Sequence, residues 1–183
     1  MTTVFIGGSR AVSRLPSVVR EKLDDLINRN CTILVGDANG ADKVVQQHFA
    51  QRGYSHVIVY CMDHCRNNLG GWPLRQVSRP GARKDFTYYA VKDAAMTQDA
   101  KCGVMLWDGK SKGTLNNVQH LINEGKKTLV YFAPERAFRK LTSEQDLEEL
   151  LQRCSQEHLQ AAQRQIKAKI PTVSQLPLHV PQP

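Results

Sequence analysis

Three glycine-rich segments hold the residue types best suited to binding a phosphate. They occupy residues 7–10, 36–42 and 108–114, where the chain of 183 residues reads GGSR, GDANGAD and DGKSKGT. Glycine lets backbone N–H groups come close to an anion, while Ser, Thr, Arg and Lys supply further donors. One such segment alone is typical of an ordinary strand-to-helix turn. Three of them in one chain favour a site for an anionic ligand.

Carboxylates beside these segments are the candidates for acid–base chemistry. Asp42 could accept a hydrogen bond from a ribose hydroxyl or act as a base, and it could equally be a helix N-terminal acid stabilised by the dipole. Asp108 suits ligand contact, and it also suits an Asx residue that holds its own turn. Asp85, the first residue of a predicted helix, and Asp42 are the catalytic candidates, and the sequence does not decide between them.

A basic segment leads into that helix. Residues 66–84 carry five Lys and Arg side chains and no acid. Trp72 lies within this segment and could stack on a base, or pack against the core as aromatic residues usually do. The helix that follows repeats suitable side chains at helical spacing, namely Asp85, Tyr89, Lys92 and Met96. They either face a ligand or divide between a solvated face and the core.

Short apolar runs alternate with longer amphipathic segments, which is typical of a parallel sheet covered by helices. The predicted strands are residues 4–6, 32–35, 56–60, 103–107 and 128–132. The predicted helices are residues 17–29, 41–52, 85–99 and 114–124. We expect an α/β, Rossmann-like doubly wound sheet of about five strands in the order 3-2-1-4-5, with helices on both faces. In such a sheet the segments after the first and fourth strands meet at the switch point where ligands bind.

The chain beyond this sheet divides into two parts. Residues 142–145 have the form of a capping box and open a predicted amphipathic helix that runs to about residue 170. Its apolar stripe packs on the preceding domain or forms a dimer contact. Residues 171–183 contain four prolines and suggest an extended tail. The expected organisation is a nucleotide-binding domain over 1–140, a helix over 141–170 and a Pro-rich tail over 171–183.

Composition narrows the class of protein. The net charge of +8 favours an anionic partner, and residues 1–132 hold 18 of the 25 basic side chains. No apolar run approaches the roughly 18 residues of a membrane span, and no signal-peptide core is visible, so we expect a soluble, cytoplasmic protein without a membrane partner. Five scattered cysteines indicate reduced core thiols. Cys61, His64 and Cys65 lack a second ligand pair for zinc, so neither a metal nor a cofactor is predicted.

Four motifs in order resemble the SLOG superfamily, and within it the YspA-like branch. They are Gly8-Ser9-Arg10, Gly36-Asp37-Ala38-x-Gly40-Ala41-Asp42, Lys92-Asp93-x-x-Met96 and Trp107-Asp108-Gly109-x-Ser111-x-Gly113-Thr114. The resemblance spans residues 4 to about 132 and implies a Rossmann-like domain that binds a nucleotide or a nucleotide derivative. The superfamily also includes the LOG phosphoribohydrolases and the DprA proteins, which bind single-stranded DNA. The GxGxxG and GxxxxGK[ST] fingerprints are absent, which disfavours a dehydrogenase and a P-loop NTPase.

The chain departs from the LOG enzymes at their catalytic residues. Their Arg-Lys-x-x-Met helix and PGGxGTxEE loop supply a catalytic Arg and Glu, whereas this chain has Lys92-Asp93 in the helix and Asn116-Asn117 in the loop. Cleavage of a glycosidic bond requires a nearby carboxylate, which an amide does not replace. Hydrolysis by the same residues is therefore not expected.

Three functions follow, in order of preference. The first is binding or sensing of a small nucleotide-like ligand. The second is cleavage or exchange at the N-glycosidic bond of a nucleoside monophosphate, and the third is single-stranded nucleic-acid binding of the DprA type. The first requires Arg10, Lys92 and Asn116 to converge on one pocket. The predicted ligand contacts are Gly8, Ser9, Arg10, Gly36, Asp37, Gly40, Asp42, Trp72, Lys92, Asp108, Gly109, Lys110, Ser111, Gly113 and Thr114.

Overall fold

Strands of this chain form one mostly parallel sheet. A computed structural model describes residues 1–78 and 86–154, and seven strands in these ranges assemble in the order β4-β3-β2-β1-β5-β6-β7. The strands are β1 (Thr3–Gly8), β2 (Thr32–Gly36), β3 (Val57–Cys61), β4 (Leu74–Gln76), β5 (Cys102–Trp107), β6 (Thr128–Phe132) and β7 (Ala137–Leu141). All neighbouring pairs are parallel except β6 and β7.

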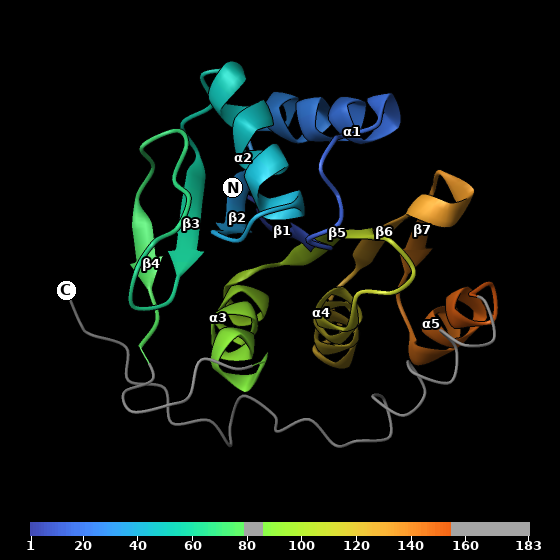
Figure 1. Cartoon of the computed structure of the whole chain (residues 1–183). Helices are drawn as coiled ribbons and strands as arrows, with labels where there is room; N and C mark the ends of the chain where they lie inside the picture. The colour runs from blue at the N-terminus through green and yellow to red at the C-terminus, as the bar shows by residue number, and fades with distance from the viewer. Residues whose placement is uncertain (79–85, 155–183) are drawn as a thin grey trace.

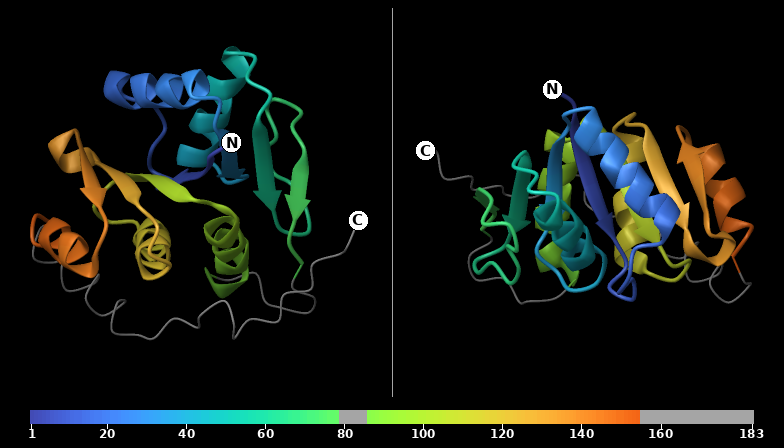
Figure 2. Two further views of the ribbon diagram at one scale, coloured as in Figure 1. Left: turned by 180° about the vertical axis from the view of Figure 1, so that it is seen from behind. Right: turned by 90° about the horizontal axis from the view of Figure 1, so that it is seen from above.

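Helices cover both faces of this sheet and make a three-layer arrangement (Figure 1). One face carries α1 (Ser17–Asn28) and α2 (Ala41–Gln51), and the other carries α3 (Phe86–Asp99), α4 (Lys112–Asn123) and α5 (Glu144–Leu151). A short 3-10 turn, Ala133–Glu135, joins β6 to β7. The view from behind in Figure 2 shows the same layers. The Rossmann-like α/β class expected from the sequence is confirmed.

Successive side chains of each strand point to opposite faces of the sheet, so the protein has two apolar cores, one on each side of the sheet. In β1, Phe5 packs with the residues of α3, α4 and α5, whereas Val4 and Ile6 pack with those of α1 and α2. Each of these three side chains is at most 1% exposed. Strands buried on both faces have near-continuous apolar sequences, which made the five central strands recognisable.

The predicted strand order is confirmed, and two strands were missed. The five predicted strands correspond to β1, β2, β3, β5 and β6 and lie in the order 3-2-1-4-5. Outside them lie β4, three exposed residues beside β3, and β7, which reads AFRKL and is antiparallel to β6. Edge strands are short and polar and lack the apolar run that marks a buried strand. The prediction of about five strands was therefore incomplete at both edges.

The segment after β6 belongs to the same core as the sheet. Ser143 caps α5 and forms a capping box with Asp146, one residue later than the predicted box over 142–145. Leu147, Leu150 and Leu151 are buried in the core cluster that includes residues of α4 and β6. This part of the apolar stripe packs in cis. The remainder of the predicted helix, to residue 170, and the tail over 171–183 lie beyond the described residues.

Candidate functional site

A cavity of about 650 Å³ opens at the carboxyl ends of β1 and β5, between the loops that follow them and the helices α3 and α4. This is where β1 separates the two halves of the sheet, the usual ligand position in an open α/β sheet. Arg10, Lys92 and Asn116 all line this cavity. Ten predicted contact residues line it, namely Gly8, Ser9, Arg10, Asp42, Lys92, Asp108, Lys110, Ser111, Gly113 and Thr114.

One side of the cavity is built by hydrogen bonds between two loops. Ser9 Oγ donates to Asp108 Oδ2 at 2.8 Å, which ties the β1 loop to the β5 loop. Asp108 Oδ1 accepts from the backbone N–H groups of Lys110 at 3.1 Å and Ser111 at 2.8 Å. Ser111 then caps α4 by accepting from the Thr114 N–H at 3.3 Å. The N-terminus of α4 is thereby aimed at the cavity, where a helix dipole favours an anion.

The environment of Asp108 keeps it ionised. Partial burial opposes the charge, but hydrogen bonds from Ser111, Ser9 and Lys110 outweigh it and hold the pKa of Asp108 below its usual range. Asp108 thus holds its own turn, one of the two roles expected for it, while also lining the cavity.

Removal of this carboxylate tests its structural role. We expect Asp108→Ala to lower the free energy of unfolding by about 2 kcal/mol, because hydrogen bonds to a charged group are lost in a partly buried loop. Asp108→Asn should lose less, since an asparagine oxygen also caps an Asx turn. Urea denaturation of the two variants measures this. An equal loss in both would show that charge, rather than the turn, is what matters.

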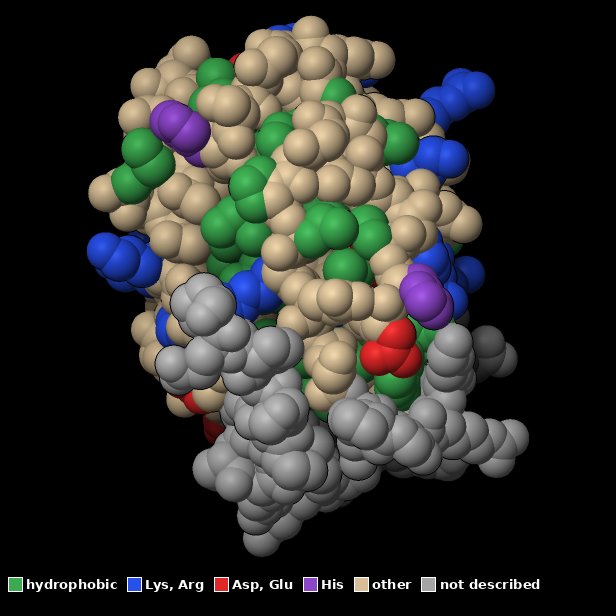
Figure 3. Space-filling model, turned by 90° about the vertical axis from the view of Figure 1, so that its left-hand side faces the viewer, with side chains coloured by type: hydrophobic (Ala, Val, Ile, Leu, Met, Phe, Trp, Pro, Cys, Tyr) green, Lys and Arg blue, Asp and Glu red, His purple; other side chains and the backbone are tan. Residues whose placement is uncertain are grey.

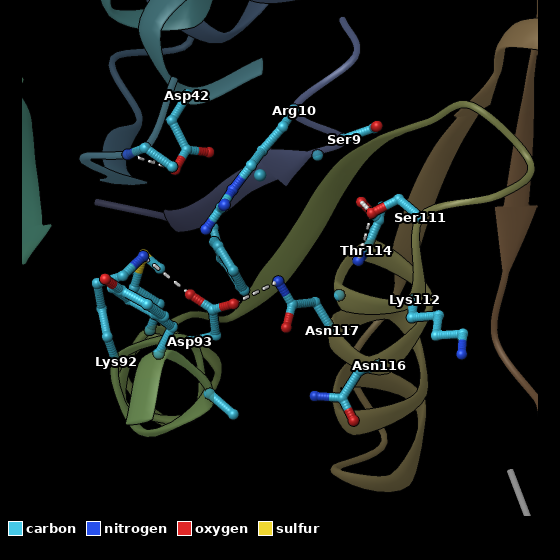
Figure 4. A pocket seen from close by; sticks show the side chains of 18 of the residues that line it. Ser9, Arg10, Asp42, Lys92, Asp93, Ser111, Lys112, Thr114, Asn116 and Asn117 are labelled. Atoms are coloured by element: carbon cyan, nitrogen blue, oxygen red, sulfur yellow. Dashed lines mark hydrogen bonds and ion pairs between the residues drawn. The ribbon is translucent and has the colours of Figure 1, made fainter. Parts of the chain in front are cut away.

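Two guanidinium groups approach one aromatic ring in the cavity. The Arg10 guanidinium carbon lies 5.9 Å from the centre of the Tyr89 ring, and that of Arg66 lies 5.0 Å from it. Buried Asp37 holds Arg66 through a bidentate contact, with Nη2 to Oδ1 at 2.7 Å and Nε to Oδ2 at 3.0 Å. Arg10 is exposed, and its side chain extends into the cavity (Figure 4). Of these two guanidinium groups, only that of Arg66 has a carboxylate partner within residues 1–78 and 86–154, which leaves Arg10 able to meet a ligand anion.

The opposite side of the cavity contains a buried cluster of charges. Lys92 is 3% exposed and donates to Asp93 Oδ1 at 2.9 Å, while Asn117 Nδ2 donates to Asp93 Oδ2 at 3.2 Å. Burial opposes the charge on Lys92, but the carboxylates of Asp93, Asp42 and Asp37 outweigh it and raise the pKa of Lys92. Burial also raises the pKa of Asp42 to about 6, despite the attraction of Lys92. An acid that titrates near neutrality suits proton transfer.

Gly36 lies beneath this cluster rather than in the cavity lining. A Cβ atom at Gly36 would lie 2.3 Å from Asp42 Oδ2 and 2.7 Å from Lys92 Nζ. The carboxyl and ammonium groups therefore occupy the space that any other residue's side chain would need. Gly36 is a positioning residue for Asp42 and Lys92, not a ligand contact.

Five predicted contacts do not line the cavity: Gly36, Asp37, Gly40, Trp72 and Gly109. Of the two roles expected for Trp72, the structure shows packing against the core and not a ring exposed to the cavity. Its side chain is 7% exposed, belongs to the core cluster of β2 and β3, and donates from Nε1 to the Tyr54 carbonyl at 2.8 Å. The indole N–H therefore has a hydrogen-bond partner, and its apolar surface is buried in the core. Asp85, the other catalytic candidate, lies outside the described residues.

Several lining residues were absent from the predicted contacts. Those with polar or aromatic polar side chains are Arg66, Tyr89, Asp93, Lys112, Asn116 and Asn117, and the others are Phe5, Gly7, Ala38, Ala90 and Met96. Helical spacing identified Tyr89 as a candidate, and Asp93, Asn116 and Asn117 belong to the motifs quoted above. The sequence alone does not show that any of these four side chains faces a cavity. The clearest signal was the Asn116-Asn117 pair where the LOG enzymes have glutamates.

The face beside β4 bears on nucleic-acid binding. Lys and Arg side chains on its described part are spread around the rim instead of forming one patch (Figure 3). Leu69 and Leu74, before and within β4, are 41% and 52% exposed. Single strands bind along continuous basic grooves with aromatic platforms. The described part of this face therefore shows no groove of that kind.

Searches of the family models and of the curated proteins find no match to this chain. The fold and the cavity define a Rossmann-like α/β protein with a pocket at its topological switch point that many charged and polar residues line. Over residues 1–78 and 86–154, no three His, Cys, Asp or Glu side chains gather as a metal site would require. Within the same ranges, no helix is long and apolar enough to cross a membrane.

Proposed function

We propose that this chain is a SLOG-type protein of the YspA-like branch that binds or senses a nucleotide or nucleotide derivative in the cavity. The observation that carries this proposal is the convergence of the β1 loop, the β5 loop and the N-terminus of α4 on one cavity that also holds Arg10. We call Ser9, Arg10, Lys110, Ser111 and Thr114 the anion end of the cavity. Arg10 and Lys110 supply guanidinium and ammonium donors and Ser111 supplies a hydroxyl, which is the chemistry of a phosphate site. The hydroxyls of Ser9 and Thr114 donate to Asp108 and Ser111 and hold these groups in place.

The remaining lining suits the uncharged part of such a ligand. Tyr89 presents an aromatic ring beside Arg10 and Arg66, on which a base could stack. Asp42 lies across the cavity from the anion end, where a sugar hydroxyl would find an acceptor. A volume of about 650 Å³ falls within the usual range for small-molecule sites.

Titration calorimetry with nucleoside mono- and diphosphates and ADP-ribose derivatives tests the proposal. We expect Arg10→Ala to weaken binding by about 10- to 100-fold, since a hydrogen bond between charged groups is lost. Arg14→Ala is the matched control, because Arg14 is exposed in the same loop but does not line the cavity. Equal affinities of the two variants, or no heat with any compound, would contradict the proposal.

A second function has one specific observation in its favour. Asp42 is buried in the cavity with its pKa raised to about 6, so it can exchange a proton near neutral pH. This suits cleavage or exchange at the N-glycosidic bond of a nucleoside monophosphate. Chromatography of the released base tests it. Turnover that Asp42→Asn leaves unchanged would remove Asp42 from this role.

A further inference from the structure

The two ends of the cavity offer opposite hydrogen-bonding chemistry. The anion end supplies donors. The other side carries Asp42 from α2 and Asp93 from α3, while Asn116 lies further along α4 than Ser111 and Thr114 (Figure 4), and we call Asp42, Asp93 and Asn116 the acceptor groups. Figure 4 shows Ser111 and Thr114 on one side of the cavity and the Lys92 and Asp93 pair on the other. A ligand that fills the cavity must therefore present different groups at its two ends.

The donors near Asp93 are already committed. Lys92 Nζ donates to Asp93 Oδ1, and Asn117 Nδ2 donates to Asp93 Oδ2. A carboxylate has about four acceptor sites on its two oxygens, so Asp93 can accept further hydrogen bonds. Its side chain is 23% exposed and lines the cavity, which leaves these sites open to a ligand. Lys92 and Asn117 thus orient Asp93 and leave it to act as an acceptor.

Asn116 supplies an independent observation. It is 3% exposed, lines the cavity, and its Oδ1 has no hydrogen-bond partner. Buried polar atoms in folded proteins nearly always have a partner, so this oxygen calls for a donor from a water or a bound ligand. A donor on a bound ligand would satisfy this oxygen.

We propose that Asp93 and Asn116 form a specificity subsite that accepts hydrogen bonds from sugar hydroxyls and excludes a second anionic group. The subsite rests on the proposed function, because it would bind the part of a phosphorylated ligand that lies away from the anion end. The carboxylate of Asp93 repels a phosphate, whereas a hydroxyl donates to it. The Asn117–Asp93 hydrogen bond joins α4 to α3, and Asn116 is the residue of α4 next to Asn117, so both acceptors line the cavity from adjoining helices. A vicinal diol is the compact group that offers two donors at once.

Calorimetry with paired nucleotides tests the subsite. The probes are the adenosine, guanosine, cytidine and uridine monophosphates, each with its 2′-deoxy counterpart. We expect the wild-type protein to prefer a ribonucleotide by about 10-fold or more, and Asp93→Asn to reduce that preference to about 3-fold or less through loss of a charged acceptor. Asp99→Asn is the matched control, because Asp99 lies on the same helix and pairs with Tyr60 outside the cavity.

Asn116→Leu is the second variant and has its own readout. It should lose the preference for ribonucleotides and melt at the same or a higher temperature without ligand, because it removes a buried unpaired oxygen. Ribonucleotides that bind no better than deoxynucleotides, or a preference that both variants keep, would overturn the subsite and leave the proposed function standing. If calorimetry detected no binding of any monophosphate, diphosphate or ADP-ribose derivative, the subsite and the proposed function would both be overturned.

Discussion

Gly40→Ala is expected to lower the free energy of unfolding by about 3 kcal/mol or more, because strain and a backbone collision coincide at this position. Gly40 has φ of 84° and ψ of −131°, a conformation open in practice only to glycine. A Cβ atom there would lie 2.4 Å from both Cα and the carbonyl oxygen of Arg10. The variant must therefore separate the N-terminus of α2 from the β1 loop, and the displaced Arg10 should no longer bind a phosphate.

Gly53→Ala is the matched control. Gly53 also has a positive φ, 61°, but a Cβ atom at this position would meet nothing within 4 Å. Only the left-handed backbone is then unfavourable, which costs roughly 1 kcal/mol. Urea denaturation of both variants, with nucleotide binding measured in parallel, separates the collision from the backbone strain. Similar midpoints for Gly40→Ala and Gly53→Ala would show that the two loops are not tightly apposed.

The central sheet could be predicted because its strands are buried on both faces. Val4, Phe5 and Ile6 form a continuous apolar run for that reason, and the glycine-rich ends of β1, β2 and β5 indicated the edge of the sheet at which the cavity lies. The edge strands β4 and β7 have no such run, since their pairing depends on the neighbouring strand and not on their own apolar pattern. The spacing of apolar residues predicts strands that are buried, and it does not predict strands that are only partly buried.

The candidate site was only partly predictable for a different reason. Residues that follow a strand can be assigned to the sheet edge from their position in the chain, which placed Ser9, Arg10 and Asp42 correctly around the cavity. Whether an aromatic residue packs inside or faces a ligand depends on contacts between distant segments. Trp72 is an example, because its partner is the Tyr54 carbonyl eighteen residues earlier. Asp93 could not be predicted to line the cavity, because the orientation of α3 is determined by its packing against α4.

Lys92→Met should destabilise the protein strongly, and the loss should depend on pH. Met keeps most of the apolar stem but removes the ammonium group, which leaves the carboxylates of Asp42 and Asp93 without the cation that offsets the charge of both. Removal of one partner from a buried ion pair typically costs about 3–5 kcal/mol, and we expect that loss at pH 8. The exposed Lys101 supplies a matched control, since Lys101→Met should change stability by less than about 0.5 kcal/mol.

The sign of the pH effect follows from Asp42. Its pKa of about 6 lies above the usual value of 3.8, so the folded protein binds a proton more tightly than the unfolded chain does. Stability attributable to Asp42 therefore falls as the pH rises from 3.8 through about 6. Without Lys92 this pKa should rise further, because the attraction that opposed protonation is gone. Lys92→Met should consequently recover much of its stability at pH 5.5, where Asp42 takes up a proton.

A double variant distinguishes charge from packing at this cluster. Lys92→Met/Asp42→Asn removes the uncompensated carboxylate, so urea denaturation at pH 8 should show it more stable than Lys92→Met alone. The stability difference between pH 5.5 and pH 8 should also shrink, since the group that takes up the proton is gone. If Lys92→Met instead lost equal stability at both pH values, and Asp42→Asn gave no recovery, the ammonium group would act through its packed stem. The cluster would then be a structural element of α3 and not the electrostatic centre of the cavity.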